Sequence, residues 1–182
     1  MATIEVGSEA INRTSQWADD WTVLQEANPA SEDFTCDTVE LWLVSGSTIA
    51  TKAGSFYGSG TDWTNRDYES LGIVSGGSKQ TFSGLDIEFQ TNDLIGGWID
   101  TGLWERSTTG GSGVLDDSGD NFGAGVKTYR TTYGNEDHSL YGSGETAGWS
   151  NIAKVNGIAS ASIAKVNGIA VASIAKVNGV AV

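Results

Sequence analysis

The chain holds few of the residues that act as nucleophiles or carry protons. It has one histidine, His138, and one cysteine, Cys36. A Ser/His/Asp triad would have to recruit His138, but its acidic and serine neighbours in sequence cannot by themselves supply triad geometry. A zinc site needs several His and Cys ligands. Two carboxylates, such as Asp100 and Glu105, could hydrolyse a glycoside, although such pairs arise freely in an acidic chain. We expect no catalytic residues and no enzymatic activity.

One acidic segment offers oxygen ligands for a hard cation. Asp116, Asp117 and Asp120 lie within Leu-Asp-Asp-Ser-Gly-Asp-Asn-Phe, and Ca²⁺ prefers several oxygen ligands. The spacing does not match an EF-hand loop, and Asp, Asn and Gly are also ordinary turn residues. The turn interpretation is favoured, so we expect no metal ion and no cofactor; Asp116, Asp117 and Asp120 are the candidate ligands if Ca²⁺ binds.

Aromatic residues are the other candidates for binding, since the chain has seven tryptophans. Trp17, Trp63 and Trp104 lie near expected turns, and Tyr57 is close to Trp63 in the sequence. Exposed aromatic rings can stack on sugars or anchor an interface, where Trp and Tyr are favoured. Ordinary packing is the favoured explanation for most of them. These four residues are therefore the candidates for a sugar-binding surface.

Composition limits the partners and the class of protein. The 182 residues allow one domain plus an appendage. A net charge of −13 would repel phosphate backbones, so we expect no nucleic-acid partner. No apolar run approaches the roughly 18 residues of a membrane span, so membrane insertion is not expected. The N-terminus lacks the basic and apolar regions of a secretory signal peptide, and one cysteine cannot form an intrachain disulfide.

Charge divides the chain into two parts. All 23 acidic residues lie at or before Glu145, and Lys154, Lys165 and Lys176 are the only charged side chains after it. The first part therefore carries 7 − 23 = −16 and the second part +3. This change predicts a domain over residues 1–147 and a tail over residues 148–182.

The first part has the pattern of an all-β domain. Val39, Leu41 and Leu43 alternate with Glu40 and Trp42, which places the two sets on opposite faces of a strand. Glycine- and serine-rich turns recur at roughly ten-residue spacing, typical of a sandwich. We predict an antiparallel β-sandwich, jelly-roll-like, with a C-terminal β-rich repeat tail. Its expected strands are Thr3–Val6, Trp21–Glu26, Thr38–Val44, Thr48–Tyr57, Tyr68–Val74, Lys79–Phe82, Asp86–Phe89, Leu94–Asp100, Gly125–Thr131 and His138–Tyr141.

The tail repeats the motif Ile-Ala-Lys-Val-Asn-Gly three times with a period of 11 residues. An 11-residue period could indicate a right-handed helical supercoil, but Asn and Gly disfavour helices. Asn-Gly between apolar residues instead suits a type I′ hairpin turn. We expect the repeats to form assembly strands through Ile152, Val155, Asn156, Gly157, Ile163, Val166, Asn167, Gly168, Ile174, Val177, Asn178 and Gly179.

The tail is mostly apolar and therefore needs a surface to pack against, because an isolated hairpin is marginal in water. The partner could be its own sandwich, a neighbour's sandwich or equivalent tails, and a frayed terminus is a further alternative. Three repeats can engage several neighbours at once and gain from multivalency. We therefore expect the chain itself to be the partner, as a homo-oligomer or polymer.

Several segments resemble a loosely defined group of β-sandwich modules. They include Ile-Glu-Val-Gly-Ser-Glu-Ala-Ile-Asn-Arg, Val-Glu-Leu-Trp-Leu, Trp-Ile-Asp-Thr-Gly and Ser-Leu-Tyr-Gly-Ser-Gly. Such modules occur in predicted phage tail, fibre and other virion proteins and in bacterial surface proteins, often followed by similar repeats. The resemblance covers nearly the whole chain and brings no catalytic residues.

This resemblance implies a location on a virion or an extracellular surface. Together with the repeat and the charge division, it predicts a non-enzymatic structural protein. Its tail strands would assemble it into a virion appendage or extracellular filament. The alternative is a carbohydrate-binding or adhesin module that takes surface glycans as partners.

Overall fold

The computed structural model describes residues 3–146 and, beyond them, only the paired residues 154–155, 158–159, 165–166, 169–170, 176–177 and 180–181. Side chains are described for residues 3–130 and 134–146. No helix long and apolar enough to cross a membrane occurs in the described part of the chain. Its elements are strands, ordered as follows: β1 Thr3–Gly7, β2 Ser15–Ala18, β3 Trp21–Gln25, β4 Phe34–Trp42, β5 Thr51–Ser59, β6 Asp62–Ser70, β7 Lys79–Phe89, β8 Leu94–Ile99, β9 Leu103–Ser107, β10 Val114–Ser118, β11 Lys127–Thr128, β12 Arg130–Tyr133, β13 Asp137–His138, β14 Leu140–Thr146, β15 Lys154–Val155, β16 Ile158–Ala159, β17 Lys165–Val166, β18 Ile169–Ala170, β19 Lys176–Val177 and β20 Val180–Ala181.

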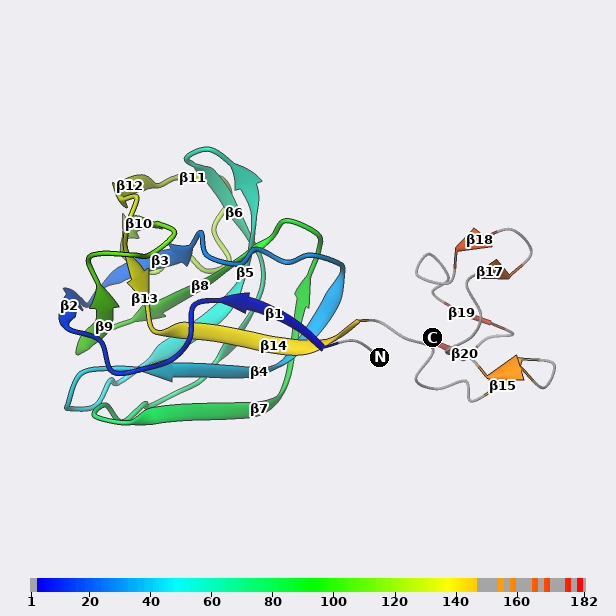
Figure 1. Ribbon diagram of the computed structural model, residues 1–182, viewed down its shortest axis with the longest axis horizontal. Helices are drawn as coiled ribbons and strands as arrows, with labels where there is room; N and C mark the ends of the chain where they lie inside the picture. Colours follow the sequence, from blue (N-terminus) through cyan, green and yellow to red (C-terminus); the bar gives the residue numbers. More distant parts are fainter. Residues whose placement is uncertain are drawn as a thin grey trace.

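Two antiparallel sheets make the sandwich (Figure 1). One has four strands in the order β1-β14-β4-β7, and the other has seven in the order β11-β6-β5-β8-β3-β10-β12. A three-stranded sheet, β13-β9-β2, adjoins the four-stranded sheet through the bridge between Trp104 of β9 and Leu43, the residue after β4. The chain passes repeatedly from one sheet to the other, so the predicted all-β, antiparallel sandwich is confirmed.

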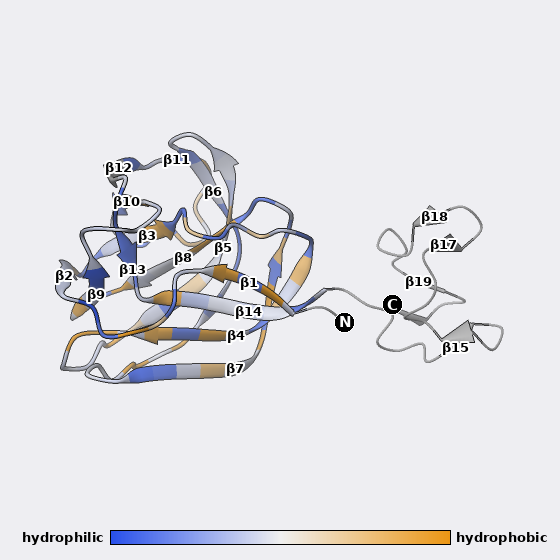
Figure 2. Ribbon diagram, viewed as in Figure 1, coloured by the Kyte–Doolittle hydropathy of each residue, from blue (hydrophilic) through white to orange (hydrophobic). Residues whose placement is uncertain are grey.

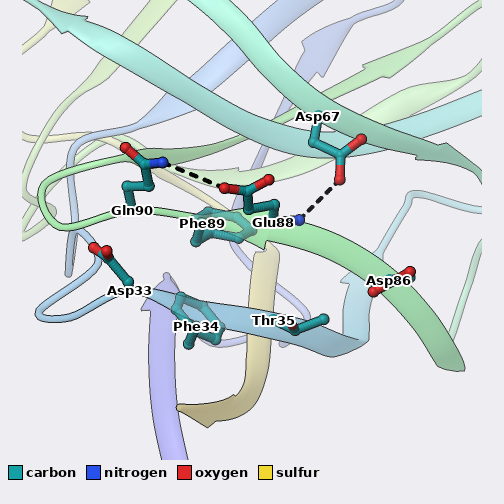
Figure 3. Close-up of a pocket in the computed structure, with 8 residues that line it drawn as sticks. All are labelled: Asp33, Phe34, Thr35, Asp67, Asp86, Glu88, Phe89 and Gln90. Atoms are coloured by element: carbon teal, nitrogen blue, oxygen red, sulfur yellow. Dashed lines mark hydrogen bonds between the residues drawn. The ribbon is translucent and has the colours of Figure 1, made fainter. Parts of the chain in front are cut away.

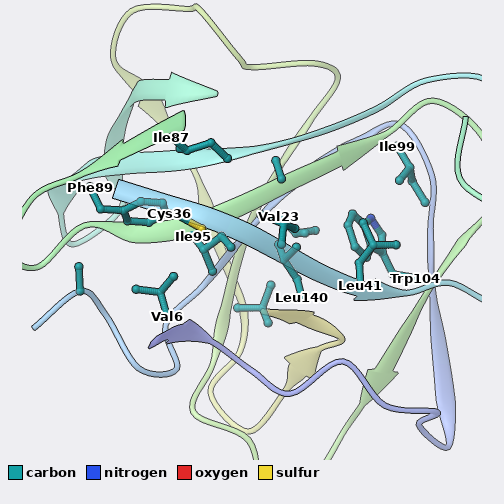
Figure 4. Close-up of a cluster of buried hydrophobic side chains, with 14 of the residues drawn as sticks. Val6, Val23, Cys36, Leu41, Ile87, Phe89, Ile95, Ile99, Trp104 and Leu140 are labelled. Carbon is teal, nitrogen blue, oxygen red and sulfur yellow. The ribbon is translucent and has the colours of Figure 1, made fainter. Parts of the chain in front are cut away.

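The main core fills the space between the two large sheets (Figure 4). The predicted alternation of β4 is confirmed, because Val39 and Leu41 are buried in this core and Glu40 and Trp42 are only partly covered. Figure 2 shows the same alternation of apolar and polar residues along the strand. The buried residues of the cluster are Ile4, Val6, Val23, Ala30, Phe34, Cys36, Val39, Leu41, Leu43, Ala53, Val74, Ile87, Phe89, Ile95, Ile99, Trp104, Val114 and Leu140.

A second core covers the outer face of the seven-stranded sheet. Phe122 and Tyr129, from the segment around β11, pack there against Leu24, Phe56, Trp63, Leu94 and Leu115. Successive residues of β3 and β10 therefore enter different cores: Val23 and Val114 lie in the main core, and Leu24 and Leu115 lie in the second core.

The pair Gly96-Gly97 lets β8 lie between both cores. A Cβ at Gly96 would come within 2.5 Å of Phe56, and one at Gly97 within 2.8 Å of Trp104. Contacts that short require the neighbours to shift, so both positions need glycine.

Some predicted strands were wrong in position or number. The strand expected at residues 68–74 is β6, Asp62–Ser70, and the two expected at 79–82 and 86–89 are one long strand, β7. The predictions missed β2, β9 and β10. All three strands are short, and β9 and β10 carry charged residues whose burial depends on partners distant in sequence, so a local pattern does not reveal them.

Candidate functional site

The tail contains three β-hairpins with the same register. Lys154 pairs with Ala159 and Val155 with Ile158. The equivalent residues of the second and third repeats form the same antiparallel pairs. Only two residues, Asn and Gly in each repeat, separate the two strands of a hairpin. This spacing agrees with the predicted hairpins.

The remaining tail predictions fall outside the described residues. The conformations of Asn156, Gly157, Asn167, Gly168, Asn178 and Gly179 are among them, as are Ile152, Ile163 and Ile174. For Val155, Val166 and Val177 the structure describes the backbone pairing alone.

The sandwich presents strand edges to which another strand could add. Edge strands carry N–H and C=O groups without ladder partners. At the edge strand β1, the backbone N–H of Gly7 donates to the Asn28 carbonyl, and the Asn28 amide donates to the Glu5 carbonyl. The Asn28 segment therefore occupies the outer side of β1.

The opposite edge of the same sheet, β7, is longer and more open. It has 11 residues and pairs on one side with β4. Near its end, Ser55 donates to the Glu88 carbonyl and the Glu88 N–H donates to Asp67. At the start of β7, the one outer hydrogen bond found among the described residues is from the Gln80 side chain to the Lys79 carbonyl.

A bulge divides β7. Ser83 pairs with Thr38 and Ile87 with Cys36, so residues 84–86 oppose a single residue of β4. Gly84 has a φ of +79° there, and a Cβ at this position would meet no atom within 4 Å. The bulge limits the regular free edge to Lys79–Ser83, where Lys79, Thr81 and Ser83 are exposed.

An acidic pocket of about 430 Å³ lies at the far end of β7 (Figure 3). Asp33, Asp67, Asp86 and Glu88 line it, and no Lys or Arg is in its lining. Phe34 and Phe89 form its apolar part, with rings stacked at 4.9 Å between centroids. Asp33 accepts hydrogen bonds from Thr91, and Asp67 accepts them from the N–H groups of Tyr68 and Glu88. The pocket is negatively charged, and the bulge separates it from the open edge Lys79–Ser83 on the same strand.

A second pocket, a groove of about 610 Å³, lies on the outer face of the four-stranded sheet. Lys79 forms an ion pair of 2.9 Å with Glu40 there. Burial, with Glu5 nearby, raises the pKa of Tyr141 to about 12. The groove is polar, and its lining residues are Glu5, Gly7, Glu9, Asn28, Glu40, Lys79, Tyr141 and Ser143.

Two of the four sugar-binding candidates are buried, which corrects that prediction. Trp104 is 0% exposed in the main core, and Trp63 is 8% exposed in the second core. Neither can present a ring face to a ligand. Both follow glycine- or turn-rich segments, so the sequence alone placed them near loops.

Each of the other two candidates has a cation over one face of its ring, and Tyr57 is otherwise exposed. The guanidinium of Arg106 lies 4.6 Å from the centre of the Trp17 ring, and that of Arg66 lies 4.7 Å from the Tyr57 ring. Cation–π contacts of this kind occupy one face of each ring. The structure therefore does not bring the four candidates together as a sugar platform.

Around Trp17 lies a cluster that sequence reasoning missed. Arg106 pairs with Glu136 and stacks on Trp17, whose ring meets Trp21 edge-on at 6.3 Å. Arg130 stacks on Trp21. Trp17, Trp21, Arg106 and Arg130 lie on β2, β3, β9 and β12 of two different sheets, and Glu136 lies just before β13, so only the tertiary structure brings them together and no sequence signal marks the cluster.

The three aspartates proposed for a metal site are engaged by separate partners. Asp116 lies on β10, not in a turn, and pairs with Arg130 at 2.7 Å. Asp117 accepts from the Asn121 amide, and Asp120 pairs with Lys52. Among the residues described, no group of three His, Cys, Asp or Glu side chains could hold a metal ion.

The residues considered for catalysis are either buried or hydrogen-bonded to backbone N–H groups. His138 is 1% exposed, and burial lowers its pKa to about 3. Cys36 is also buried, and burial raises its pKa to about 12. Asp100 accepts the backbone N–H groups of Ile49 and Ala50, whereas Glu105 accepts that of Arg13.

Scans against family models, curated proteins and solved structures found no match to the chain.

Proposed function

We propose that this protein is a structural protein that assembles with copies of itself through its C-terminal repeat strands. The observation that carries the proposal is the common register of the three tail hairpins. Identical units with identical pairing can make equivalent contacts repeatedly. The described core residues of the sandwich all lie between Ile4 and Leu140, which supports a body that folds without the tail.

Physical arguments favour a partner for these hairpins. Each has two paired residues per strand, whereas isolated two-stranded hairpins are marginal in water. Addition to a larger sheet would supply backbone hydrogen bonds and bury Ile, Val and Ala side chains. The body at −16 would attract the tail at +3, within about 10 Å at 0.1 M salt.

The biological setting is part of the same proposal. A virion appendage or an extracellular filament would use such a chain as a repeating subunit, and the resemblance to virion and surface modules supports this setting. The proposal assigns no catalytic residues.

Removing residues 151–182 tests the proposal. The full chain should form oligomers or filaments visible by negative-stain microscopy, and their mass should rise with concentration in sedimentation velocity. The truncated chain should remain folded and monomeric, with the β-rich circular dichroism spectrum of the sandwich. A full chain that stays monomeric at high concentration, or a truncated one that assembles normally, would refute it.

A second candidate function is glycan binding in the groove on the outer face of the four-stranded sheet. The groove has the size of a ligand site and combines the Tyr141 ring with the polar side chains of Glu40 and Lys79. A glycan array should then show selective binding that Tyr141→Ala removes and Trp63→Phe, in the second core, retains. Absence of selective binding by the intact chain would dismiss this candidate.

A further inference from the structure

We infer that the edge Lys79–Ser83 of β7 accepts a tail strand from a second copy of this chain. The inference rests on the proposed function and names the surface that the assembly uses. The added strand would extend the four-stranded sheet β1-β14-β4-β7 beyond β7. Strand addition of this kind takes affinity from main-chain hydrogen bonds and register from side-chain contacts.

Comparison of the edges selects β7. The edge strands β2, β11, β12 and β13 have two to four residues each, which limits the hydrogen bonds an added strand could form. The outer side of β1 is occupied by Asn28. Lys79–Ser83 offers five residues in regular register with β4, and alternate residues of an edge strand direct their backbone groups outward.

The strand β6 is the other long strand near an edge, since β11 covers only Asp62 and Trp63. Further along, the Asn65 side chain accepts the Gly123 N–H, and Asp67 accepts the Glu88 N–H. The segment before β11 and the end of β7 therefore lie against β6. This leaves the first half of β7 as the longest edge with its outer side open among the described residues.

Charge complementarity indicates which strand would bind at the open edge of β7. The only charged side chains after Glu145 are Lys154, Lys165 and Lys176. Beyond the bulge that ends the open edge, Asp86 and Glu88 of the same strand are exposed and line a pocket without Lys or Arg. The one cation on the edge, Lys79, is already paired with Glu40. A cationic apolar strand fits this edge better than an acidic one does.

A copy in trans is favoured over the chain's own tail because the repeats number three. One β7 edge of five residues can pair with one tail strand at a time. The other repeats then remain available for further copies, and linked sites of this kind raise the overall avidity.

Cysteine cross-linking of the full chain tests the inference. One preparation carries Ser83→Cys on β7 and the other, with an affinity tag, carries Ser162→Cys between the first and second repeats. The native Cys36 is buried and stays in place. After mixing and mild oxidation, a disulfide-linked dimer of the two preparations should form. Thr3→Cys on β1 and Ser70→Cys on β6 are the matched controls at exposed positions of other strands, and we expect at least tenfold less dimer with either.

The outcomes distinguish a failure of the β7 inference from a failure of the proposed assembly function. If the chain assembles but Thr3→Cys or Ser70→Cys links to the tail as well as Ser83→Cys does, the β7 inference is wrong and the assembly function stands. If a chain carrying both Ser83→Cys and Ser162→Cys closes an internal disulfide at high dilution, docking in trans is wrong. If the intact chain never assembles, both proposals are wrong.

Charge reversal provides an independent measurement. Asp86→Lys with Glu88→Lys should weaken assembly of the full chain at least tenfold, and Lys→Glu at all three tail lysines should restore it. If neither set of substitutions alters assembly, charge does not guide the tail strand to β7, and the assignment of the tail to this edge is wrong.

Discussion

The imidazole of His138 lies stacked on the indole of Trp104, with ring centroids 6.2 Å apart and both side chains buried. His138 also pairs through its backbone with Arg106 across β13 and β9. Burial, followed by the charges of Arg106 and Arg13, lowers its pKa from 6.5 to about 3. The ring is therefore neutral in the folded protein at neutral pH.

This relationship predicts a loss of stability in mild acid. The unfolded chain binds a proton at His138 below pH 6.5, whereas the folded chain does not until about pH 3. Above pH 6.5, His138 is neutral in both states and does not lower the free energy of unfolding. Between pH 6.5 and about pH 3, this free energy falls as the pH falls. For this residue, the free energy of unfolding should drop by about 2 kcal/mol between pH 7 and pH 5.

The control for this prediction is His138→Phe, which retains a ring but cannot titrate. Urea denaturation at the two pH values gives the drop for each protein. The drop should be about 2 kcal/mol smaller in the variant, because all other groups titrate in both proteins. Equal drops would show that His138 is protonated in the folded state.

Substitution of Gly97 should disturb the main core. A Cβ at this position would lie 2.8 Å from the Trp104 ring and 3.0 Å from Leu140. Gly97→Ala should lower the free energy of unfolding by about 1–3 kcal/mol, as overpacked cores do. Gly125→Ala is the matched control, since a Cβ there meets nothing within 4 Å. Similar denaturation midpoints for both variants would contradict this packing.

The ion pair between Arg106 and Glu136 should behave as a buried pair. Arg106 donates to both carboxylate oxygens at 3.0 Å, and the two side chains are 16% and 3% exposed. Arg106→Met leaves an unpaired buried carboxylate and should cost about 3 kcal/mol. Adding Glu136→Gln should recover part of this loss.

The exposed pair Lys79–Glu40 is the comparison for that measurement. Its lysine side chain is 46% exposed, so Lys79→Ala should cost less than about 1 kcal/mol. If Lys79→Ala lowered the free energy of unfolding as much as Arg106→Met does, burial would not determine how strongly these ion pairs stabilise the protein.

Cys36 should be unreactive in the folded protein. The thiol is buried, and burial raises its pKa to about 12. Thiolates, not thiols, attack disulfide reagents. At pH 8 a colorimetric thiol reagent should detect no free thiol in the native chain and one after unfolding in urea. Rapid labelling of the native chain would place Cys36 at the surface.

The turn of the second hairpin should be sensitive to a β-branched residue. A type I′ turn needs positive φ at both central residues, and a non-glycine residue there costs about 1–2 kcal/mol. Gly168→Val should therefore weaken assembly in sedimentation velocity. Ser160→Val is the control, because the second repeat has Val171 at the equivalent position. Unchanged assembly of Gly168→Val would argue against a shared turn.

Local patterns in the sequence determined the fold class. Alternation along β4 and the recurring glycine-rich turns predicted the sandwich because side chains in a strand point alternately to opposite faces. The 11-residue repeat predicted the tail hairpins because Asn-Gly is a short-range turn signal. The single histidine and the single cysteine limited the possible chemistry, since a zinc site needs several such ligands.

The tertiary structure decided what surrounds each side chain. It buried Trp63 and Trp104, paired Asp116 with Arg130, and left the first half of β7 open while Asn28 covers β1. These outcomes depend on which strands become neighbours, and the residues involved are often far apart along the chain. Composition and periodicity indicate which face of a strand is buried and which is exposed to solvent. Which strands become neighbours depends on the packing of the whole sandwich.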